Sequence, residues 1–130
     1  MVVEYARNQL GHADANSREF NEKTSYAVII EMPEHNPGNL GGTMRLGLRK
    51  TVFEKDTDSI AQKLYAHHNN TAVKNMTEFH ERHRHRYEVN PKLIEEITAK
   101  KDFIFTAKDT TGERMEVAEL VDHPFYGREK

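Results

Sequence analysis

The chain carries at residues 79–97 the stretch FHERHRHRYEVNPKLIEEI, in which an alternating segment is followed directly by a helix signal. Neighbouring side chains of an extended strand point to opposite faces, so the histidines and arginines separate onto two faces. The histidine face would hold His83 and His85 with Tyr87 and Val89, and the arginine face Arg82, Arg84 and Arg86 with Glu88. Asn90-Pro91 is a typical helix start, with asparagine as the cap and proline in the first turn. A strand that leads into a helix in this way indicates an α/β or α+β domain.

Further strands are expected on both sides of this stretch. Tyr26–Met32 predicts a short buried strand, while Phe103–Ala107 and Arg114–Leu120 predict two strands joined by a turn at Asp109–Gly112. Thr43–Phe53 alternates between apolar and basic residues, which is typical of a half-buried strand with its apolar side inward. Its apolar members are Met44, Leu46, Leu48 and Val52, and its basic members are Arg45 and Arg49.

Helices are expected at residues 1–10 and after Thr57 or Asp58, either of which can cap a segment with apolar pairs four residues apart. Loops are expected at residues 13–24, at residues 33–42 with a turn at Pro37-Gly38, and at residues 67–77 as an exposed insertion.

Composition narrows the functional classes. The 130 residues suit one domain, and the formal net charge of −2 argues against a general nucleic-acid binder. The absence of cysteine excludes disulfides, thiolate metal ligands and a cysteine nucleophile on this chain. No apolar run is long enough for a membrane span, and no signal peptide is visible. A soluble cytoplasmic protein that contacts neither membrane nor nucleic acid is the expectation.

The histidines and arginines of residues 80–86 allow three interpretations. His83 and His85 could bind zinc if His80, Glu78 or His123 supplied a third ligand. Alternatively, the imidazoles are structural and the arginines are solvated. The third interpretation is anion recognition, because an arginine fork holds a carboxylate in one orientation. Nucleic-acid binding is disfavoured, since the cluster has one aromatic residue.

Three blocks together resemble the glutamine amidotransferase domain of CTP synthase, and the eukaryotic form most of all. They are DANSREF (Asp14–Phe20), MPEHNPGNLGGTMRLG (Met32–Gly47) and ERHRHRYEVNP (Glu81–Pro91). VEYARN at Val3–Asn8 and GERMEVAELVDHPF at Gly112–Phe125 also fit, so the resemblance covers nearly the whole chain. It implies a class I amidotransferase fold, an α/β domain with a central, mostly parallel sheet flanked by helices.

The resemblance also implies an activity. The family makes CTP from UTP with ATP and Mg²⁺, using ammonia that a Cys-His-Glu triad releases from glutamine, and GTP activates it. The enzymes form tetramers and often filaments. The resemblance assigns the glutamine amine to Glu19 and the glutamine carboxylate to Arg86, with help from the backbone at Tyr87. By a weaker correspondence, residues 44–46 would lie near the GTP-sensitive junction with the synthetase domain.

This sequence departs from the family pattern in its catalytic residues. The family's nucleophile elbow would precede residue 1, and its HPE signature would follow Tyr126; His123 aligns better with an HPF that precedes the last strand. We therefore expect residues 1–130 to be a partial amidotransferase domain that holds the glutamine-binding residues but no catalytic residue, metal or cofactor, and is inactive alone. The alternative is a catalytically dead glutamine-binding or assembly module derived from CTP synthase.

Overall fold

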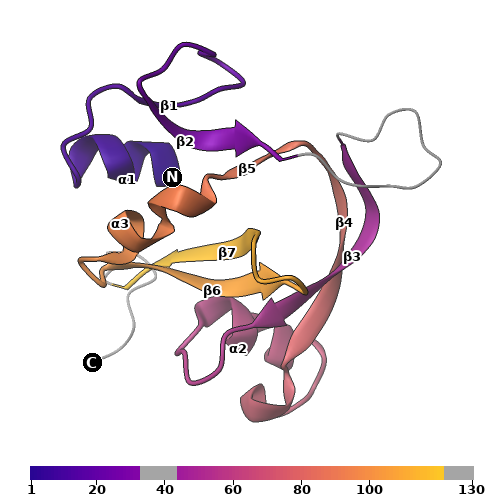
Figure 1. The fold of residues 1–130 in the computed structure, drawn as a ribbon. Coiled ribbons are helices and arrows are strands. Elements are labelled where there is room, and N and C mark those ends of the chain that lie inside the picture. Colours follow the sequence, from indigo (N-terminus) through magenta and orange to yellow (C-terminus); the bar gives the residue numbers. More distant parts are fainter. Residues whose placement is uncertain (33–43, 122–130) are drawn as a thin grey trace. The chain divides into compact units, whose positions relative to one another are not determined.

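A computed structural model describes residues 1–32 and 44–121 of the chain. Two compact units make up the chain (Figure 1): residues 1–48 with 82–97, and residues 49–81 with 98–130. The expected loop at residues 33–42, its Pro37-Gly38 turn and His123 lie outside the described residues.

Strands outnumber helices, and helices intervene between groups of strands at several points, as expected. The helices are α1 (Val2–Asn8), α2 (Ile60–His68), η1 (Val73–Asn75), η2 (Pro91–Leu93) and α3 (Ile94–Thr98). The strands are β1 (Ala15–Ser17), β2 (Tyr26–Glu31), β3 (Arg45–Phe53), β4 (Glu78–His85), β5 (Tyr87–Val89), β6 (Phe103–Asp109) and β7 (Met115–Leu120). None of these helices has the length and apolar character that a membrane crossing requires.

The first unit is built around a three-stranded sheet in the order β1-β2-β5. β1 runs parallel to β2, with Ala15 opposite Tyr26, and β5 runs antiparallel to β2, with Val89 opposite Ile29. Helix α1 packs against β1 and β2 and buries Tyr5 and Ala6. The predicted loop at residues 13–24 is therefore wrong at β1, which is too short and too polar to show a strand pattern.

The helix start at Asn90 is confirmed. The Asn90 side chain accepts a hydrogen bond from the Lys92 backbone N–H at 3.1 Å and donates one to the Ala27 carbonyl at 2.9 Å. The first satisfies an amide that the helix leaves unpaired, and the second ties the helix to β2. The first turn is a 3-10 turn, η2, and α3 follows it with Ile97 fully buried.

The second unit is centred on the β6-β7 hairpin, in which the two strands are antiparallel as predicted. β3 pairs with β6 through residues 51–53, also antiparallel, and the full sheet order is β4-β3-β6-β7. The fold is thus of the mixed α/β class. Among the described pairings with a register, however, β1 with β2 is parallel and the others are antiparallel.

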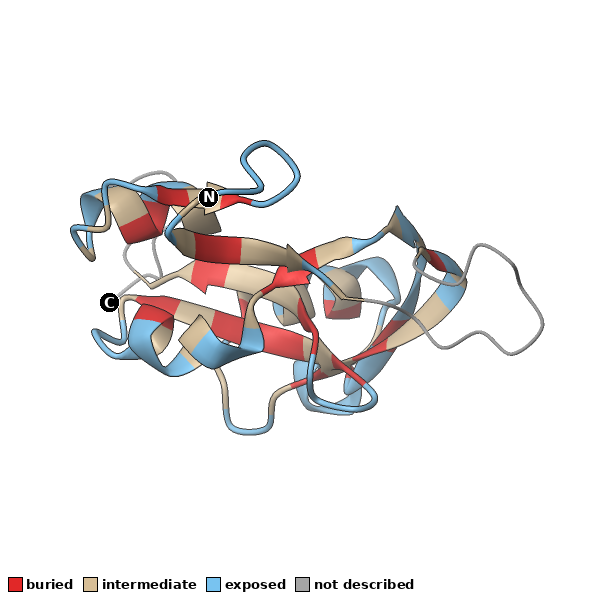
Figure 2. Ribbon diagram, turned by 45° about the horizontal axis from the view of Figure 1, so that its top comes forward, coloured by how far each residue is buried: buried red, intermediate tan, exposed pale blue. Residues whose placement is uncertain are grey.

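A buried apolar cluster stabilises the second unit. Its members are Phe53, Ala66, Met76, Phe79 and Ala107. The Tyr65 ring stacks on Phe79 with centroids 4.1 Å apart. Met76 lies in the segment predicted to be an exposed insertion, so that prediction is wrong at this residue, because the methionine is buried in the apolar cluster. Many of the buried residues lie on strands, and many of the turns are exposed (Figure 2).

Helix α2 is capped by Ser59, not by Thr57 or Asp58 as expected. The Ser59 hydroxyl accepts from the Gln62 backbone N–H at 3.1 Å, and the Glu119 carboxylate accepts from the Ile60 N–H at 2.9 Å. The carboxylate from β7 thus accepts from the Ile60 and Ala61 amides, and the cap lies at Ser59, two residues beyond Thr57.

The predicted orientation of β3 is also wrong. Arg45 is only 3 % exposed, whereas Leu48 is 63 % exposed. Arg45 is buried because its guanidinium lies against the buried Glu88 carboxylate, 3.5 Å away. Glu88 does not share the exposed face of Arg82 and Arg84, because the strand is interrupted at Arg86 and the alternation does not continue into β5.

Candidate functional site

The first unit contains a pocket of about 660 Å³. Its lining residues come from α1, the end of β1 and the turn after it, β2, the residue before β3, and the β4-β5 segment. They are Val3, Ser17, Glu19, Phe20, Ile29, Met44, Arg84, His85, Arg86 and Tyr87. The three residues that the sequence predicts as a glutamine site, Glu19, Arg86 and Tyr87, all line it.

Glu19 lies in a turn immediately after β1. The Glu19 backbone N–H donates to the Ser17 hydroxyl at 3.2 Å, and the Asn21 N–H donates to the Ser17 carbonyl at 3.0 Å. The Arg18 N–H donates to the Ile29 carbonyl of β2 at 3.0 Å. The backbone of the turn is thereby fixed to the sheet, while the Glu19 side chain is exposed at the pocket.

Arg86 is the single residue between β4 and β5. Its carbonyl accepts a hydrogen bond from the Met32 N–H at 3.0 Å, and the next residue, Tyr87, pairs with Glu31 of β2. The backbone is therefore anchored on both sides of the Arg86 side chain, which is exposed. A fixed backbone with an exposed guanidinium is suited to holding an anion in one direction.

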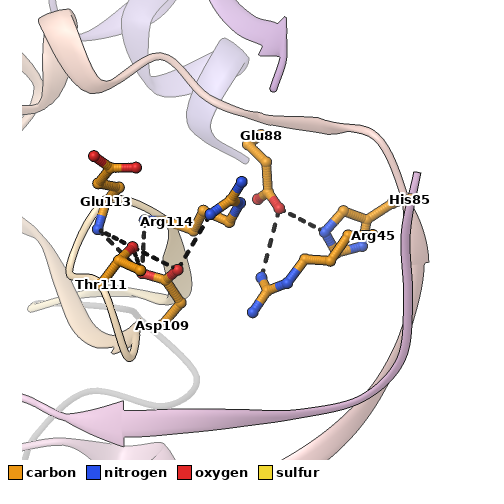
Figure 3. Close-up of polar contacts among 7 residues, drawn as sticks. All are labelled: Arg45, His85, Glu88, Asp109, Thr111, Glu113 and Arg114. Carbon is orange, nitrogen blue, oxygen red and sulfur yellow. Dashed lines mark hydrogen bonds and ion pairs between the residues drawn. The ribbon is translucent and has the colours of Figure 1, made fainter. Parts of the chain in front are cut away.

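Behind the pocket lies a polar cluster that sequence reasoning missed, formed by Arg45, His85 and Glu88 (Figure 3). Glu88 Oε1 lies 2.8 Å from His85 Nε2 and 3.5 Å from an Arg45 nitrogen. His85 and Glu88 are three residues apart in the sequence, and this short spacing could have suggested their contact. The burial of Arg45 could not be predicted from the sequence, because its partner Glu88 is more than forty residues away in the chain.

The charges on the pocket wall are of both signs. Glu19 supplies a carboxylate, and Arg84 and Arg86 supply guanidinium groups. A free amino acid carries one ammonium and one carboxylate, so a wall of this kind complements both ends of such a ligand. The arrangement can therefore bind and orient a zwitterion.

The zinc interpretation finds no support in the described residues. The rings of His83 and His85 lie 5.1 Å apart, but no group of three histidine or acidic residues that could hold a metal ion occurs in residues 1–32 and 44–121. Glu78, one suggested third ligand, forms an ion pair with Lys50 at 2.9 Å, and this hydrogen-bonded contact lowers the pKa of Glu78.

Residues 6–128 match the family model described as "Glutamine amidotransferase class-I". The chain belongs to this family, which confirms the fold class inferred from the sequence. Within it, the chain is similar to the eukaryotic CTP synthases. It is 54 % identical over 125 residues to CTP synthase 1-A of Xenopus laevis, 52 % to CTP synthase 2 of Bos taurus and 49 % to CTP synthase 2 of Homo sapiens.

These alignments cover 96 % of this chain and 20 % of each relative, so the chain spans about one fifth of the length of the curated relatives it matches. A solved structure gives the same result: the glutaminase domain of Trypanosoma brucei CTPS with bound acivicin superposes with a TM-score of 0.68 at 34 % identity. That match covers 92 % of this chain and 42 % of the other. The resemblance inferred from the three sequence blocks is thus confirmed.

Proposed function

We propose that this chain is the glutamine-binding segment of a glutamine-hydrolysing CTP synthase, with L-glutamine held in the pocket of the first unit. The observation that supports the proposal is that Glu19 and the adjacent pair Arg86 and Tyr87 line one pocket, although Glu19 is far from that pair in the sequence. Membership of the amidotransferase family and the similarity to CTP synthases support it independently.

Each of the three residues has a defined role in the proposal. The Glu19 carboxylate accepts hydrogen bonds from the α-ammonium of glutamine. The Arg86 guanidinium binds the α-carboxylate through two parallel N–H donors, and the Tyr87 backbone assists it. With both ends held, the side-chain amide points in one direction, which reduces the entropy that a reaction at that amide would have to overcome.

The wider activity belongs to the whole enzyme. Ammonia from glutamine would be used to aminate UTP to CTP with ATP and Mg²⁺ in the synthetase domain, with GTP as activator and residues 44–46 near the junction. A tetramer or filament would be the assembled form. In this proposal the ATP and Mg²⁺ chemistry belongs to the synthetase domain of the whole enzyme.

A second candidate function is a catalytically dead glutamine-binding or assembly module. The observation that favours it is the absence of cysteine from the 130 residues. A thioester route needs a thiolate, so this chain would bind glutamine without hydrolysing it. In either case, ammonia release from glutamine by the purified chain should stay at background, and release above background contradicts both.

Calorimetric titration of the chain with three ligands tests the proposal. L-Glutamine carries both α-groups, glutaramic acid lacks the amine, and 4-aminobutanamide lacks the α-carboxylate. We expect L-glutamine to bind and each truncated ligand to bind at least about 10-fold more weakly, since each leaves one charged wall group unpaired. Absence of L-glutamine binding, or equal affinity for all three, contradicts the proposal.

A further inference from the structure

The wall of the pocket at His85 is backed by a buried ion pair. Arg45 is 3 % exposed and Glu88 is 7 % exposed. At this depth, water can hydrate neither the Arg45 guanidinium nor the Glu88 carboxylate well. A buried carboxylate is tolerated only when cationic or N–H groups surround it. Glu88 Oε1 meets this need through Arg45 at 3.5 Å and through His85 Nε2 at 2.8 Å.

This contact constrains His85. A carboxylate only accepts hydrogen bonds, so Nε2 carries the proton that is donated to Glu88. The ring is thereby held in one tautomer and one orientation at the pocket, which it lines. Figure 3 shows Glu88 pointing between the His85 ring and the Arg45 guanidinium.

The same contact also spans the segment that carries the predicted anion-binding groups. β4 ends at His85 and β5 begins at Tyr87, so a hydrogen bond from His85 to Glu88 closes over Arg86 and Tyr87. Glu88 is not among the residues that line the pocket. Its effect on a ligand would therefore be exerted through the residues that it contacts.

We propose that Glu88 is a positioning residue of the amino-acid pocket. Its buried carboxylate, paired with Arg45, clamps His85 and so fixes the direction in which Arg86 and the Tyr87 backbone meet the α-carboxylate of the ligand. The inference rests on the proposed function, because it deepens the role of the same pocket.

The decisive variant removes both buried charges together. Replacing a buried ion pair with apolar residues of similar size is often neutral for stability, so Arg45→Met/Glu88→Leu should stay folded while His85 loses its acceptor. We expect the Kd for L-glutamine to rise at least about 10-fold with little change in Tm. Lys63→Met/Asp58→Asn, which removes an exposed pair 2.6 Å apart in the second unit, is the control and should change Kd less than about 2-fold.

A thermodynamic cycle separates positioning from a general structural role. If Glu88 acts through His85, adding Arg45→Met/Glu88→Leu to a His85→Ala chain should change the Kd less than about 2-fold further. A full additional loss of affinity in the His85→Ala background overturns the proposal. If the double variant does not fold, Glu88→Gln takes its place in the same cycle, with a smaller expected loss of about 3-fold because one oxygen remains as acceptor.

A measurement without ligand distinguishes failure of this inference from failure of the proposed function. In the ligand-free chain, backbone ¹⁵N relaxation should show Arg86 and Tyr87 as ordered as Val89, and in Arg45→Met/Glu88→Leu these two residues should become mobile on the ps–ns timescale. Unchanged order there overturns the clamp, whether or not glutamine binds. Loss of order together with no glutamine binding by the unaltered chain retains the clamp and rejects the glutamine pocket.

Discussion

The Ser59 hydroxyl donates a hydrogen bond to Glu119 Oε1 at 2.6 Å, across sixty residues of chain. The same carboxylate accepts from the Thr106 hydroxyl at 2.8 Å and from the Ile60 backbone N–H at 2.9 Å. One buried acid thus joins the start of α2 to the β6-β7 hairpin and replaces the water that helix amides would otherwise need.

Glu119→Gln should destabilise the chain by about 1–3 kcal/mol at pH 7, because the amide donates where the carboxylate accepts and so leaves donors facing donors. Urea unfolding followed by circular dichroism measures the change. Glu95→Gln, at an exposed glutamate, is the control and should lie within about 0.5 kcal/mol of the unaltered chain.

The stability of the chain should fall in acid, and Glu119 should contribute to the fall. Burial alone would raise the pKa of Glu119, but hydrogen bonds from Ser59, Ile60, Thr106 and Ala61 outweigh it and lower the pKa below the ordinary 4.5. The stabilisation is therefore complete above pH 4.5 and is lost as the pH falls through the folded-state pKa. Between pH 6 and pH 3, Glu119→Gln should lose less stability than the unaltered chain, and equal slopes would contradict this assignment.

Arg86→Ala should weaken L-glutamine binding by about 30- to 100-fold, since a bidentate charged contact is removed. Arg86→Lys should recover only part of this affinity, because an ammonium cannot present two parallel donors. Arg82→Ala is the matched control, being an exposed arginine of β4 that does not line the pocket. Calorimetry with all three variants measures the effect, and an equal loss in Arg82→Ala would show that the effect is not local.

Glu19→Gln should weaken L-glutamine binding by about 10-fold and leave binding of glutaramic acid unchanged, because that ligand lacks the ammonium that Glu19 is proposed to hold. Competition titration with the two ligands gives both affinities on one sample. A parallel loss for both ligands would assign Glu19 a role in the shape of the pocket in place of charge recognition.

Phe79→Ala should destabilise the chain by about 3–5 kcal/mol, because Phe79 is a member of the apolar cluster and contacts Phe53 and Tyr65. Phe20→Ala removes an aromatic ring that is 82 % exposed and should change stability by less than about 0.5 kcal/mol. Thermal unfolding of the pair tests whether the cluster is the core of the second unit, and similar Tm values would exclude it.

Local signals in the sequence predicted the local structure well. Asn90-Pro91 starts a helix and Asp109–Gly112 forms a turn, with the Gly112 N–H donating to the Asp109 carbonyl at 3.1 Å, because these conformations depend on residues close together in the chain. The inward face of β3 could not be predicted in this way. Arg45 is buried against a carboxylate from another strand, and alternation alone favours burying the leucines.

The same difference between local signals and contacts of distant segments applies to the candidate site. Glu19, Arg86 and Tyr87 came from resemblance between motifs, and no periodicity distinguishes Arg86 from Arg82 or Arg84. The buried cluster of Arg45, Glu88 and His85 was not predicted from the sequence. Its residues lie in two separate segments, and the cluster forms only when the chain folds.

The interruption at Arg86 has a consequence for engineering. β4 belongs to the four-stranded sheet and β5 to the three-stranded sheet, so position 86 lies outside both strands. A side chain at position 86 is therefore not subject to the alternation between buried and exposed faces that restricts residues within a strand. Under the glutamine-binding role proposed for Arg86, saturation of this one codon should yield folded chains with altered ligand preference, making position 86 the natural starting point for a biosensor.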